Sequence, residues 1–566
     1  MAPIECYERF LSGEARRFTH ASLAALINRF SGVDDVISLA GGLPPAAAFP
    51  LERIDATTRT GLTVSLGEEG QLAYLAQQYN FNPQGHTPLL ASLRDLTQRL
   101  HGVPVPAAPA GGEGPWAAKQ GGGAAQAPAG PGEEAAGDAG AGPAPAAPPA
   151  PLPPRDLVLC SGAIHGIFAA IACLTDPGDT LVVDEYTYTH ALECVFLPRD
   201  LRLLPVRGDE QGMDPADLEA QLRAVAAAAA SGGAGGAGAV RAPRLAYVIP
   251  TGHNPTGAIM GEGRKRELLQ VASRHDLMII EDDAYWWLTY PQPGSQAQAQ
   301  AEAQAQAQAG PADAAERPQD PSLQAGLGGL PRSLLSLDGE GRVLRVDTFS
   351  KLLGPGYRLG WLTAPLPLVP KLANWVMGST VGPCSVTQVL VHQLLQRWGW
   401  EGFDTYLRGL QASRGGGADA ALYASRAAAA HAAALEHLGP LGAEWRQAHG
   451  GMFMWIRLPV PDVGALLDSL VAARVVVAPG GMFATRGLQA TLVVDDGRQG
   501  PGTPAEGPGP GPVASPFLRL SFAGLPPAAV AEGMRRLAGA TREALAGAAG
   551  EGGAGGAAGG QGHAAE

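Results

Sequence analysis

Lys351 has the residue type and setting that indicate the most specific chemistry in this chain. It lies in the segment FSKLLGPGYR, directly after Arg342–Thr348, an apolar run that predicts a buried strand. Two leucines follow it, so we expect a partly buried amine. Burial lowers the pKa of a lysine and makes it a candidate Schiff-base nucleophile. Arg358, in the same segment, has a guanidinium suited to bidentate anion binding. Because an isolated lysine is usually solvated, this interpretation depends on the residues around it.

Three carboxylates stand together after a second apolar run. Leu277–Ile280 is followed by Glu281, Asp282 and Asp283, with Tyr285 close behind. Burying carboxylates is costly unless a cation neutralises them. A metal ion could do so, although no His or fourth ligand stands nearby at metal spacing. A cationic ring of a ligand is an equally good partner, and both interpretations stay open here.

Two more predicted strands end in polar turns. RLAYVI (244–249) is followed by PTGHNPTG, in which prolines and glycines fix a tight turn that presents Asn254. DLVLC (156–160) is followed by Ser161–Ala163 at the start of a predicted helix, where N–H groups and the helix dipole suit an anion such as phosphate. An ordinary Asn-Pro turn and an ordinary Ser-Gly turn would explain the same letters, so each signal is weak alone.

The elements that must position these residues alternate between strand and helix. The predicted strands are Asp156–Cys160, Thr180–Val183, Arg244–Ile249, Leu277–Ile280 and Arg342–Thr348, and the predicted helices are Ala163–Leu174 and Arg264–His275. This alternation predicts an α/β fold with a sheet covered by helices on both faces. Ligands of such sheets bind beyond the carboxyl ends of the strands. The polar groups described above fall there, as does Tyr188.

Composition separates this folded part from low-complexity stretches. The chain has 566 residues, with 78 Gly and 49 Pro, and no Gly-X-Y period that would indicate a collagen. Gly, Ala and Pro concentrate at about 103–154, 226–243 and 497–515, Ala and Gln alternate at 295–309, and a Gly/Ala tail covers 545–566. These stretches have too few large apolar side chains to offset ordering entropy, so we predict that they are disordered.

Charge and cysteine content exclude several classes of protein. A net charge of −13 without a Lys/Arg run argues against nucleic-acid binding. The five cysteines form no C-x-x-C pair, which argues against a zinc site and for reduced thiols. No apolar run approaches the ~18 residues of a membrane span. The N-terminal residues lack the apolar region of a signal peptide, so we expect a cytoplasmic protein.

Taken together, the motifs resemble the pyridoxal-phosphate-dependent aminotransferases of fold type I, class I/II. The resemblance is strongest to the kynurenine/2-aminoadipate and fungal-type aromatic aminotransferases. The segments that carry it are ISLAGGLPPAAAFP (37–50), LAQQYNFNPQGHTPLLASL (75–93), PTGHNPTG (250–257), IIEDDAYWWL (279–288), FSKLLGPGYRLGW (349–361) and FLRLSFA (517–523). Each piece is weak alone, but the set in this order is highly specific.

The resemblance implies a three-layer αβα large domain with a mostly parallel sheet and a smaller α+β C-terminal domain. The implied boundaries are an N-terminal segment at 1–36, a large domain at 37–420 with inserts at about 103–154, 226–243 and 291–331, a small domain at 421–545 with an insert at about 497–515, and a disordered tail at 546–566.

It also implies a role for each matching residue. Lys351 would hold pyridoxal 5′-phosphate as a Schiff base and move the substrate proton. Asp282 would pair with the protonated ring nitrogen and keep the ring an electron sink. Tyr285 and Asn254 would hydrogen-bond the phenolic oxygen of the ring, and Tyr188 would stack on its face.

The remaining implied roles concern the cofactor phosphate and the substrate. Ser161, Gly162, Ala163, Ser350 and Arg358 would hold the phosphate, and Tyr79 would reach that of a neighbouring subunit in a homodimer. Arg519 would bind the substrate α-carboxylate in a pocket lined by Gly42 and Asn254. The chain departs from the family by having Ile164 after the phosphate turn, and by lacking the expected N-terminal substrate arginine within 19–24.

The reaction implied is transamination of an L-amino acid (aromatic, kynurenine or 2-aminoadipate) with a 2-oxo acid, 2-oxoglutarate being the expected acceptor, in two half-reactions. A lyase or decarboxylase on the same scaffold is the alternative. A cofactor-sensing regulator would need a DNA-binding domain ahead of residue 37, where no basic helix pair occurs. Trp286, Trp287 and Tyr357 suit either an aromatic substrate or core packing.

Overall fold

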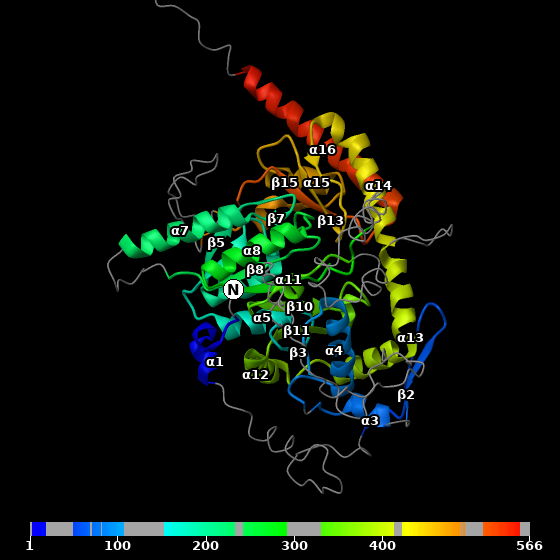
Figure 1. Cartoon of the computed structure of the whole chain (residues 1–566). Coiled ribbons are helices and arrows are strands. Elements are labelled where there is room, and N and C mark those ends of the chain that lie inside the picture. Colours follow the sequence, from blue (N-terminus) through cyan, green and yellow to red (C-terminus); the bar gives the residue numbers. More distant parts are fainter. Residues whose placement is uncertain are drawn as a thin grey trace, which may run out of the picture.

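A seven-stranded sheet forms the centre of the molecule in the computed structural model (Figure 1). In order across the sheet its strands are β3 (Arg155–Cys160), β11 (Gly360–Pro365), β10 (Val343–Thr348), β9 (Met278–Asp282), β8 (Leu245–Val248), β4 (Thr180–Asp184) and β5 (Arg202–Val206). β11 is antiparallel to both of its neighbours, and the other neighbouring pairs are parallel. The mostly parallel sheet predicted from the sequence is therefore confirmed.

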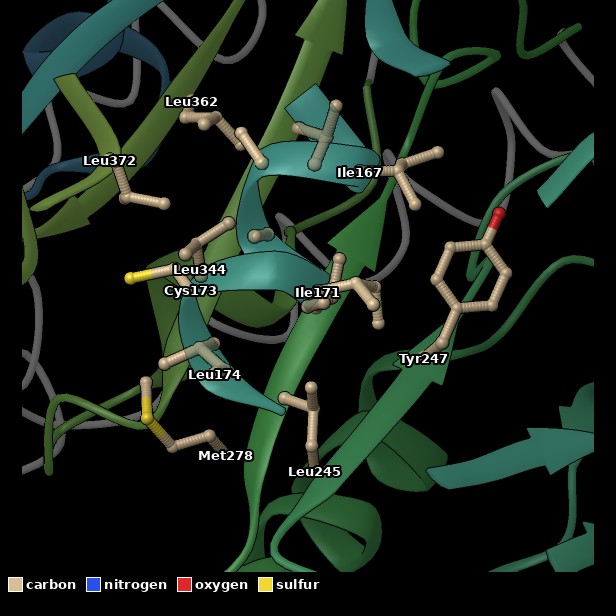
Figure 2. Close-up of a cluster of buried hydrophobic side chains, with 14 of the residues drawn as sticks. Ile167, Ile171, Cys173, Leu174, Leu245, Tyr247, Met278, Leu344, Leu362 and Leu372 are labelled. Carbon is tan, nitrogen blue, oxygen red and sulfur yellow. The ribbon is translucent and has the colours of Figure 1, made fainter. Parts of the chain in front are cut away.

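Helices cover both faces of this sheet, which explains why its inner strands read as continuous apolar runs. One face packs against α1 (Gly13–Arg17), α5 (Ala163–Leu174) and α12 (Val369–Thr380), and the other against α7 (Pro215–Ser231), α8 (Glu262–Arg274) and α11 (Leu334–Leu337). Figure 2 shows Ile167 and Ile171 of α5 lying over Leu245, Met278 and Leu344 of the sheet. Every residue of β3, β4, β8, β9 and β10 is buried.

A smaller α+β unit follows along the chain and lies at the top of Figure 1 in yellow, orange and red. Its antiparallel strands, in spatial order, are β12 (Glu444–Trp445), β13 (Phe453–Arg457), β15 (Phe517–Ser521) and β14 (Ala478–Pro479), and its helices are α14 (Leu422–His437), α15 (Leu467–Ala472) and α16 (Pro527–Ala554). It has its own hydrophobic cluster, which also takes in Tyr285 and Tyr290 from the large unit. The predicted domain boundary at 420–421 lies outside the described residues.

Further elements flank the large sheet. They are α3 (Leu72–Gln77), α4 (Thr87–His101), the long kinked α13 (Ser385–Gln411), the hairpin of β1 (Ile54–Thr57) and β2 (Thr63–Leu66), the short α6 (Thr189–Ala191), and the hairpin of β6 (Gly208–Asp209) and β7 (Gly212–Met213). Among the residues with assigned positions, no helix is long and apolar enough to cross a membrane. The five cysteines are free thiols.

The structure describes residues 3–17, 49–67, 71–80, 82–106, 152–231, 241–290, 330–411, 422–486, 488, 491–492 and 513–554. Ordered structure extends past several of the predicted insert edges. α7 continues to Ser231 and α16 to Ala554, because alanine has the highest helix propensity and both stretches are rich in it. At the first insert Val103 is buried, and the N–H of Arg155 donates to the Pro104 carbonyl.

Candidate active site

The predicted site residues gather at one edge of the sheet because the strands run mostly parallel. β8, β9 and β10 end side by side. Asp282 is the last residue of β9, and the loops after β8 and β10 present Asn254 and Lys351. β11 runs the opposite way, so Arg358, two residues before its first residue, reaches the same edge. The register confirms this placement, since Thr348 at the end of β10 pairs with Gly360 at the start of β11.

Lys351 follows β10 and lies beside Tyr285. Its Nζ is 5.7 Å from the centre of the Tyr285 ring, a cation–π distance. Burial lowers the pKa of Lys351, the cations Arg519 and Arg358 lower it further, and the carboxylate of Asp282 offsets part of this effect. A lowered pKa raises the fraction of neutral amine near pH 7, which is the nucleophilic form.

Asp282 is the last residue of β9 and is buried at 5% exposure. The hydroxyl of Tyr247 donates to its Oδ2 at 2.6 Å, whereas its Oδ1 has no hydrogen-bond partner in the described structure. Burial raises the pKa of Asp282 to about 6, against a smaller lowering by the Tyr247 bond. A buried carboxylate oxygen without a partner is costly, so this one fits a ligand that brings a proton or a positive charge.

The two carboxylates beside Asp282 already share a cationic partner. Arg345, fully buried on β10, contacts Glu281 at 3.2 Å, Asp283 at 2.8 Å and Asp347 at 2.9 Å. Glu281 also accepts from the N–H groups of Leu334 and Leu335 at the start of α11. Nowhere in the described part of the chain do three or more His, Cys, Asp or Glu residues form a group that could hold a metal ion. Of the two interpretations of the carboxylate run, the cationic ligand ring is therefore the one that fits.

The turn after β3 brings together several of the residues predicted to bind phosphate. The guanidinium of Arg358 donates to the Ser161 carbonyl at 3.0 Å and covers Gly162 so closely that a Cβ there would meet it at 2.8 Å. Gly162 adopts a φ of +83°, which favours glycine. Ser350 lies in a turn in which the Thr348 hydroxyl donates to its Oγ at 2.9 Å.

One of the predicted phosphate donors is already used. The N–H of Ser161 donates to Nδ1 of His165 at 3.0 Å, so this backbone group is engaged inside the turn. Because Nδ1 accepts, the neutral imidazole carries its proton on Nε2, which lies 2.8 Å from the Ser379 hydroxyl. The first-turn N–H groups of α5 keep the helix-terminal character that suits an anion. Ile164, the departure from the family pattern, packs against the hydrophobic cluster on this side of the sheet.

Arg519 comes from the small unit, and its side chain extends to the Asn254 turn of the site. It lies on β15, and one of its terminal nitrogens donates to Oδ1 of Asn254 at 2.8 Å. Its guanidinium is also over the rings of Phe453 at 4.3 Å and Phe483 at 4.8 Å. Its Nε has no hydrogen-bond partner among the described residues. A half-buried guanidinium with a donor to spare is suited to a carboxylate.

Comparison with known proteins agrees with this geometry. The family model for aminotransferase class I and II matches residues 150–537. This chain belongs to that family. A mitochondrial kynurenine/alpha-aminoadipate aminotransferase of Rattus norvegicus is 26% identical over 483 residues, which is 84% of this chain and 91% of that protein. An aromatic amino acid aminotransferase of Schizosaccharomyces pombe is 31% identical over 305 residues, 54% of this chain and 57% of its own length.

Solved structures support the same fold. An aminotransferase from Candida albicans superposes with a TM-score of 0.67 at 21% identity, over 96% of this chain and 99% of its own. A kynurenine aminotransferase from Pyrococcus horikoshii superposes with a TM-score of 0.57 at 22% identity over the same shares. The class I/II aminotransferase fold predicted from the sequence is confirmed, and the chain is an aminotransferase.

Some predicted residues of the aminotransferase do not join this cluster. Tyr79 is 59% exposed beside a small surface hollow lined by Leu75 and His86. Gly42 and residues 19–24 lie outside the described residues. Trp286 and Trp287 are each 2% exposed inside the core beside α4 and α13, so core packing accounts for them rather than substrate contact. Tyr188, by contrast, does lie at the cluster. It immediately precedes α6, half-buried, with its ring stacked on that of His190 at 5.8 Å. Burial raises its pKa, the charge of Asp282 raises it further, and Arg358 and Arg519 lower it.

Sequence reasoning missed three residues that the aminotransferase site depends on. The hydroxyl of Tyr247 donates to Asp282, and Arg345 forms ion pairs with the carboxylates beside it. His165 accepts a hydrogen bond from the N–H of Ser161. Two of them sit on apolar strands and read as ordinary strand residues. Their positions beside β9 follow from strand register, for which the sequence carries no local signal.

A cavity lies beside this site rather than over Lys351. It has a volume of about 570 Å³ and lies between the Asn254 turn, the β6–β7 hairpin and the small sheet. Its acidic side chains are paired, as Asp209 is with Arg264 at 2.8 Å and Glu210 with Arg446 at 3.0 Å. Lys351 and Asp282 do not line it, so the chemistry is assigned to the strand-end cluster.

Proposed function

We propose that the chain is a pyridoxal-phosphate-dependent transaminase that moves the amino group of an L-amino acid to a 2-oxo acid in two half-reactions. The proposed donors are aromatic amino acids, kynurenine or 2-aminoadipate, in line with the names of the relatives, and the proposed acceptor is 2-oxoglutarate. The observation that carries the cofactor assignment is that Oδ1 of the buried Asp282 has no hydrogen-bond partner among the described residues. Lys351, whose pKa burial lowers, lies in the same cluster.

The residues present fit this cofactor at each of its ends. Asp282 would face the ring nitrogen, Asn254 and Tyr285 the phenolic oxygen, and Tyr188 the ring face. Ser161, Gly162, Ala163, Ser350 and Arg358 would hold the phosphate. When bound, the pyridinium ring supplies an electron sink for the substrate carbanion.

The chain's own groups then have separate tasks. The amine of Lys351 is partly neutral because burial lowers its pKa. It would take the proton from the substrate α-carbon and deliver it to the cofactor carbon that receives the amino group. Arg519 would hold the substrate α-carboxylate with its spare donor, in a geometry fixed by the bond to Asn254. The rings of Phe453 and Phe483 around that guanidinium would keep water from the ion pair and strengthen it.

Substitution of Lys351 by alanine tests the assignment. The purified wild-type protein is expected to be yellow and to form glutamate from 2-oxoglutarate with at least one of the proposed donors. Lys351→Ala is expected to lose the visible absorbance of the lysine-bound cofactor and essentially all turnover, because the covalent attachment point and the proton carrier are the same amine. Lys371→Ala serves as a matched control on α12, and absorbance spectra with a glutamate assay give the readout. Unchanged colour in Lys351→Ala would contradict the assignment.

We also propose that the active form is a homodimer in which Tyr79 reaches the phosphate of the neighbouring subunit. Its support is the exposure of Tyr79 and Leu75 beside the hollow between α3 and α13, since large apolar groups are rarely left in such a cluster. Sedimentation of the holoenzyme should give twice the chain mass, and Tyr79→Phe should weaken cofactor retention by roughly tenfold. A stable, active monomer would contradict this proposal.

A further inference from the structure

Tyr247 holds the one carboxylate oxygen of Asp282 that is engaged. Its hydroxyl donates to Oδ2 at 2.6 Å, and both side chains are buried, Tyr247 at 0% and Asp282 at 5% exposure. Burial and the negative charge of Asp282 hold the pKa of Tyr247 well above its usual range, so the phenol stays the donor. The bond therefore stabilises the charged form of the carboxylate.

The position of this hydroxyl is set by packing rather than by Asp282. The ring of Tyr247 meets Phe196 edge to face at 5.1 Å and belongs to the hydrophobic cluster between α5 and the sheet. Figure 2 shows it standing on its strand, with Ile171 of α5 close by. Tyr247 on β8 pairs with Ile280 on β9, two residues before Asp282, so its hydroxyl extends toward the strand end.

The two oxygens of Asp282 are thereby given different tasks. Since Oδ2 is bound from the side of β8, rotation of the carboxylate is restricted and Oδ1 is left as the free acceptor. Arg345 cannot do this, because its terminal contacts go to Glu281, Asp283 and Asp347. In the described structure no Lys, Arg or His forms an ion pair with Asp282.

We propose that Tyr247 is a positioning residue of the transamination, which aims Oδ1 of Asp282 at the cofactor ring nitrogen and keeps the shared proton on that nitrogen. This inference rests on the proposed function. One proton lies between the ring nitrogen and Oδ1. With the Tyr247 bond present the carboxylate is the weaker base and the ring is a pyridinium. Without the bond the carboxylate becomes more basic, the proton moves to Oδ1, and the neutral ring withdraws electrons less well.

Tyr247→Phe tests this role because it removes one oxygen and leaves the packed ring in place. Wild type and variant would be loaded with pyridoxal phosphate carrying ¹⁵N in the ring, and the protonated fraction read from the nitrogen chemical shift. We expect a lower pyridinium fraction, a kcat lower by about tenfold and a nearly unchanged KM for the amino donor. An unchanged nitrogen shift in Tyr247→Phe would overturn the proposal.

A binding measurement separates positioning from a merely structural role. The apoprotein would be titrated with pyridoxamine phosphate and with its analogue in which C–H replaces the ring nitrogen. We expect Tyr247→Phe to lose about tenfold affinity for the first compound and little for the second, and to lose nothing further in an Asp282→Asn background. Equal losses for both compounds would overturn the role of Tyr247 alone, whereas a wild type that binds neither would overturn the proposed function as well.

Tyr7→Phe is the matched control for these experiments. Tyr7 is also a buried tyrosine, but its hydroxyl donates at 2.9 Å to the main-chain carbonyl of Gly341. The Tyr7→Phe variant should leave both the ring-nitrogen chemical shift and the ratio of the two affinities at wild-type values. A Tyr7→Phe protein that shifted them as Tyr247→Phe does would also overturn the proposal.

Discussion

The end of β9 carries two kinds of buried carboxylate that lie next to each other in the chain. Glu281 and Asp283 meet Arg345, whereas Asp282 between them meets Tyr247. Successive residues of a strand point to opposite faces of the sheet, so one side of β9 receives a cation and the other receives a phenol. The difference shows that a buried carboxylate with a cationic partner serves the fold, whereas one without such a partner is available for chemistry.

On the side of β9 that holds Arg345, one cation offsets three carboxylates. Arg345 is fully buried, with three carboxylates around it, and its pKa is held well above its usual range, the attraction of Asp347 and the other acids outweighing burial. Glu281 receives further hydrogen bonds from α11. The open side contains Asp282, whose carboxylate has a hydrogen bond but no counter-charge, and whose pKa burial raises to about 6. Arg345 therefore offsets part of the cost of burying its acids, since burial still raises the pKa values of Glu281 and Asp347, whereas the free oxygen of Asp282 has no such partner.

Arg345→Met is expected to have the largest effect and to act on stability. It would leave buried carboxylates without a counter-charge, which costs about 3–5 kcal/mol. Denaturant unfolding of the apoprotein would show this as a lower midpoint, while the activity of each molecule that remains folded should change much less. The conservative Arg345→Lys should recover only part of the loss, since it cannot contact three carboxylates at once. A midpoint equal to that of the wild type would break the comparison.

Asp282→Asn should show the opposite pattern. It keeps an acceptor for the Tyr247 hydroxyl and removes the charge, so we expect kcat to fall by about 100- to 1000-fold. The free energy of unfolding of the apoprotein should stay level or rise slightly, because an uncompensated buried charge has been removed. Steady-state kinetics and denaturant unfolding on the same preparation check both halves. Near-normal turnover would contradict the electron-sink role assigned to Asp282.

The sequence predicts the side of β9 that carries Asp282 better than the side that holds Arg345. Lys351, Asp282, Asn254 and Arg519 follow or occupy strands in recognisable motifs, and a parallel sheet brings strand ends together whatever the loops contain. Arg345 and Tyr247 lie inside apolar strands, where local pattern gives no sign of a partner on the next strand. Their importance depends on register, which is a tertiary property.

Insert edges were hard to predict for a related reason. An alanine run has low complexity and little to bury, yet it extends a helix already begun, as α7 does to Ser231. Composition measures how much surface a stretch can bury, whereas helix continuation depends on the preceding turn. The same limit applies to Val103, an apolar residue at the edge of a low-complexity stretch, which is buried in the same hydrophobic cluster as residues of α8 and α11.

The smallest effect should appear in the pH dependence of cofactor binding, and it sharpens the comparison further. Because burial raises the pKa of Asp282 to about 6, the empty native site takes up a proton more readily than the unfolded chain does. Ionising Asp282 therefore lowers the stability of the apoprotein as pH rises toward and through 6. A cation bound at Oδ1 reverses that loss. Affinity for pyridoxamine phosphate should consequently be about tenfold weaker at pH 5 than at pH 7.5, where the carboxylate is charged.

The phosphate of the ligand also titrates near pH 6, so a single profile does not isolate Asp282. Asp282→Asn removes the carboxylate component and keeps the phosphate component, and the difference between the two profiles belongs to Asp282 alone. Calorimetric titration of both apoproteins across this range gives that difference. Superimposable profiles would show that Asp282 does not change charge as the ligand binds, and the open side of β9 would then be as closed electrostatically as the side that holds Arg345.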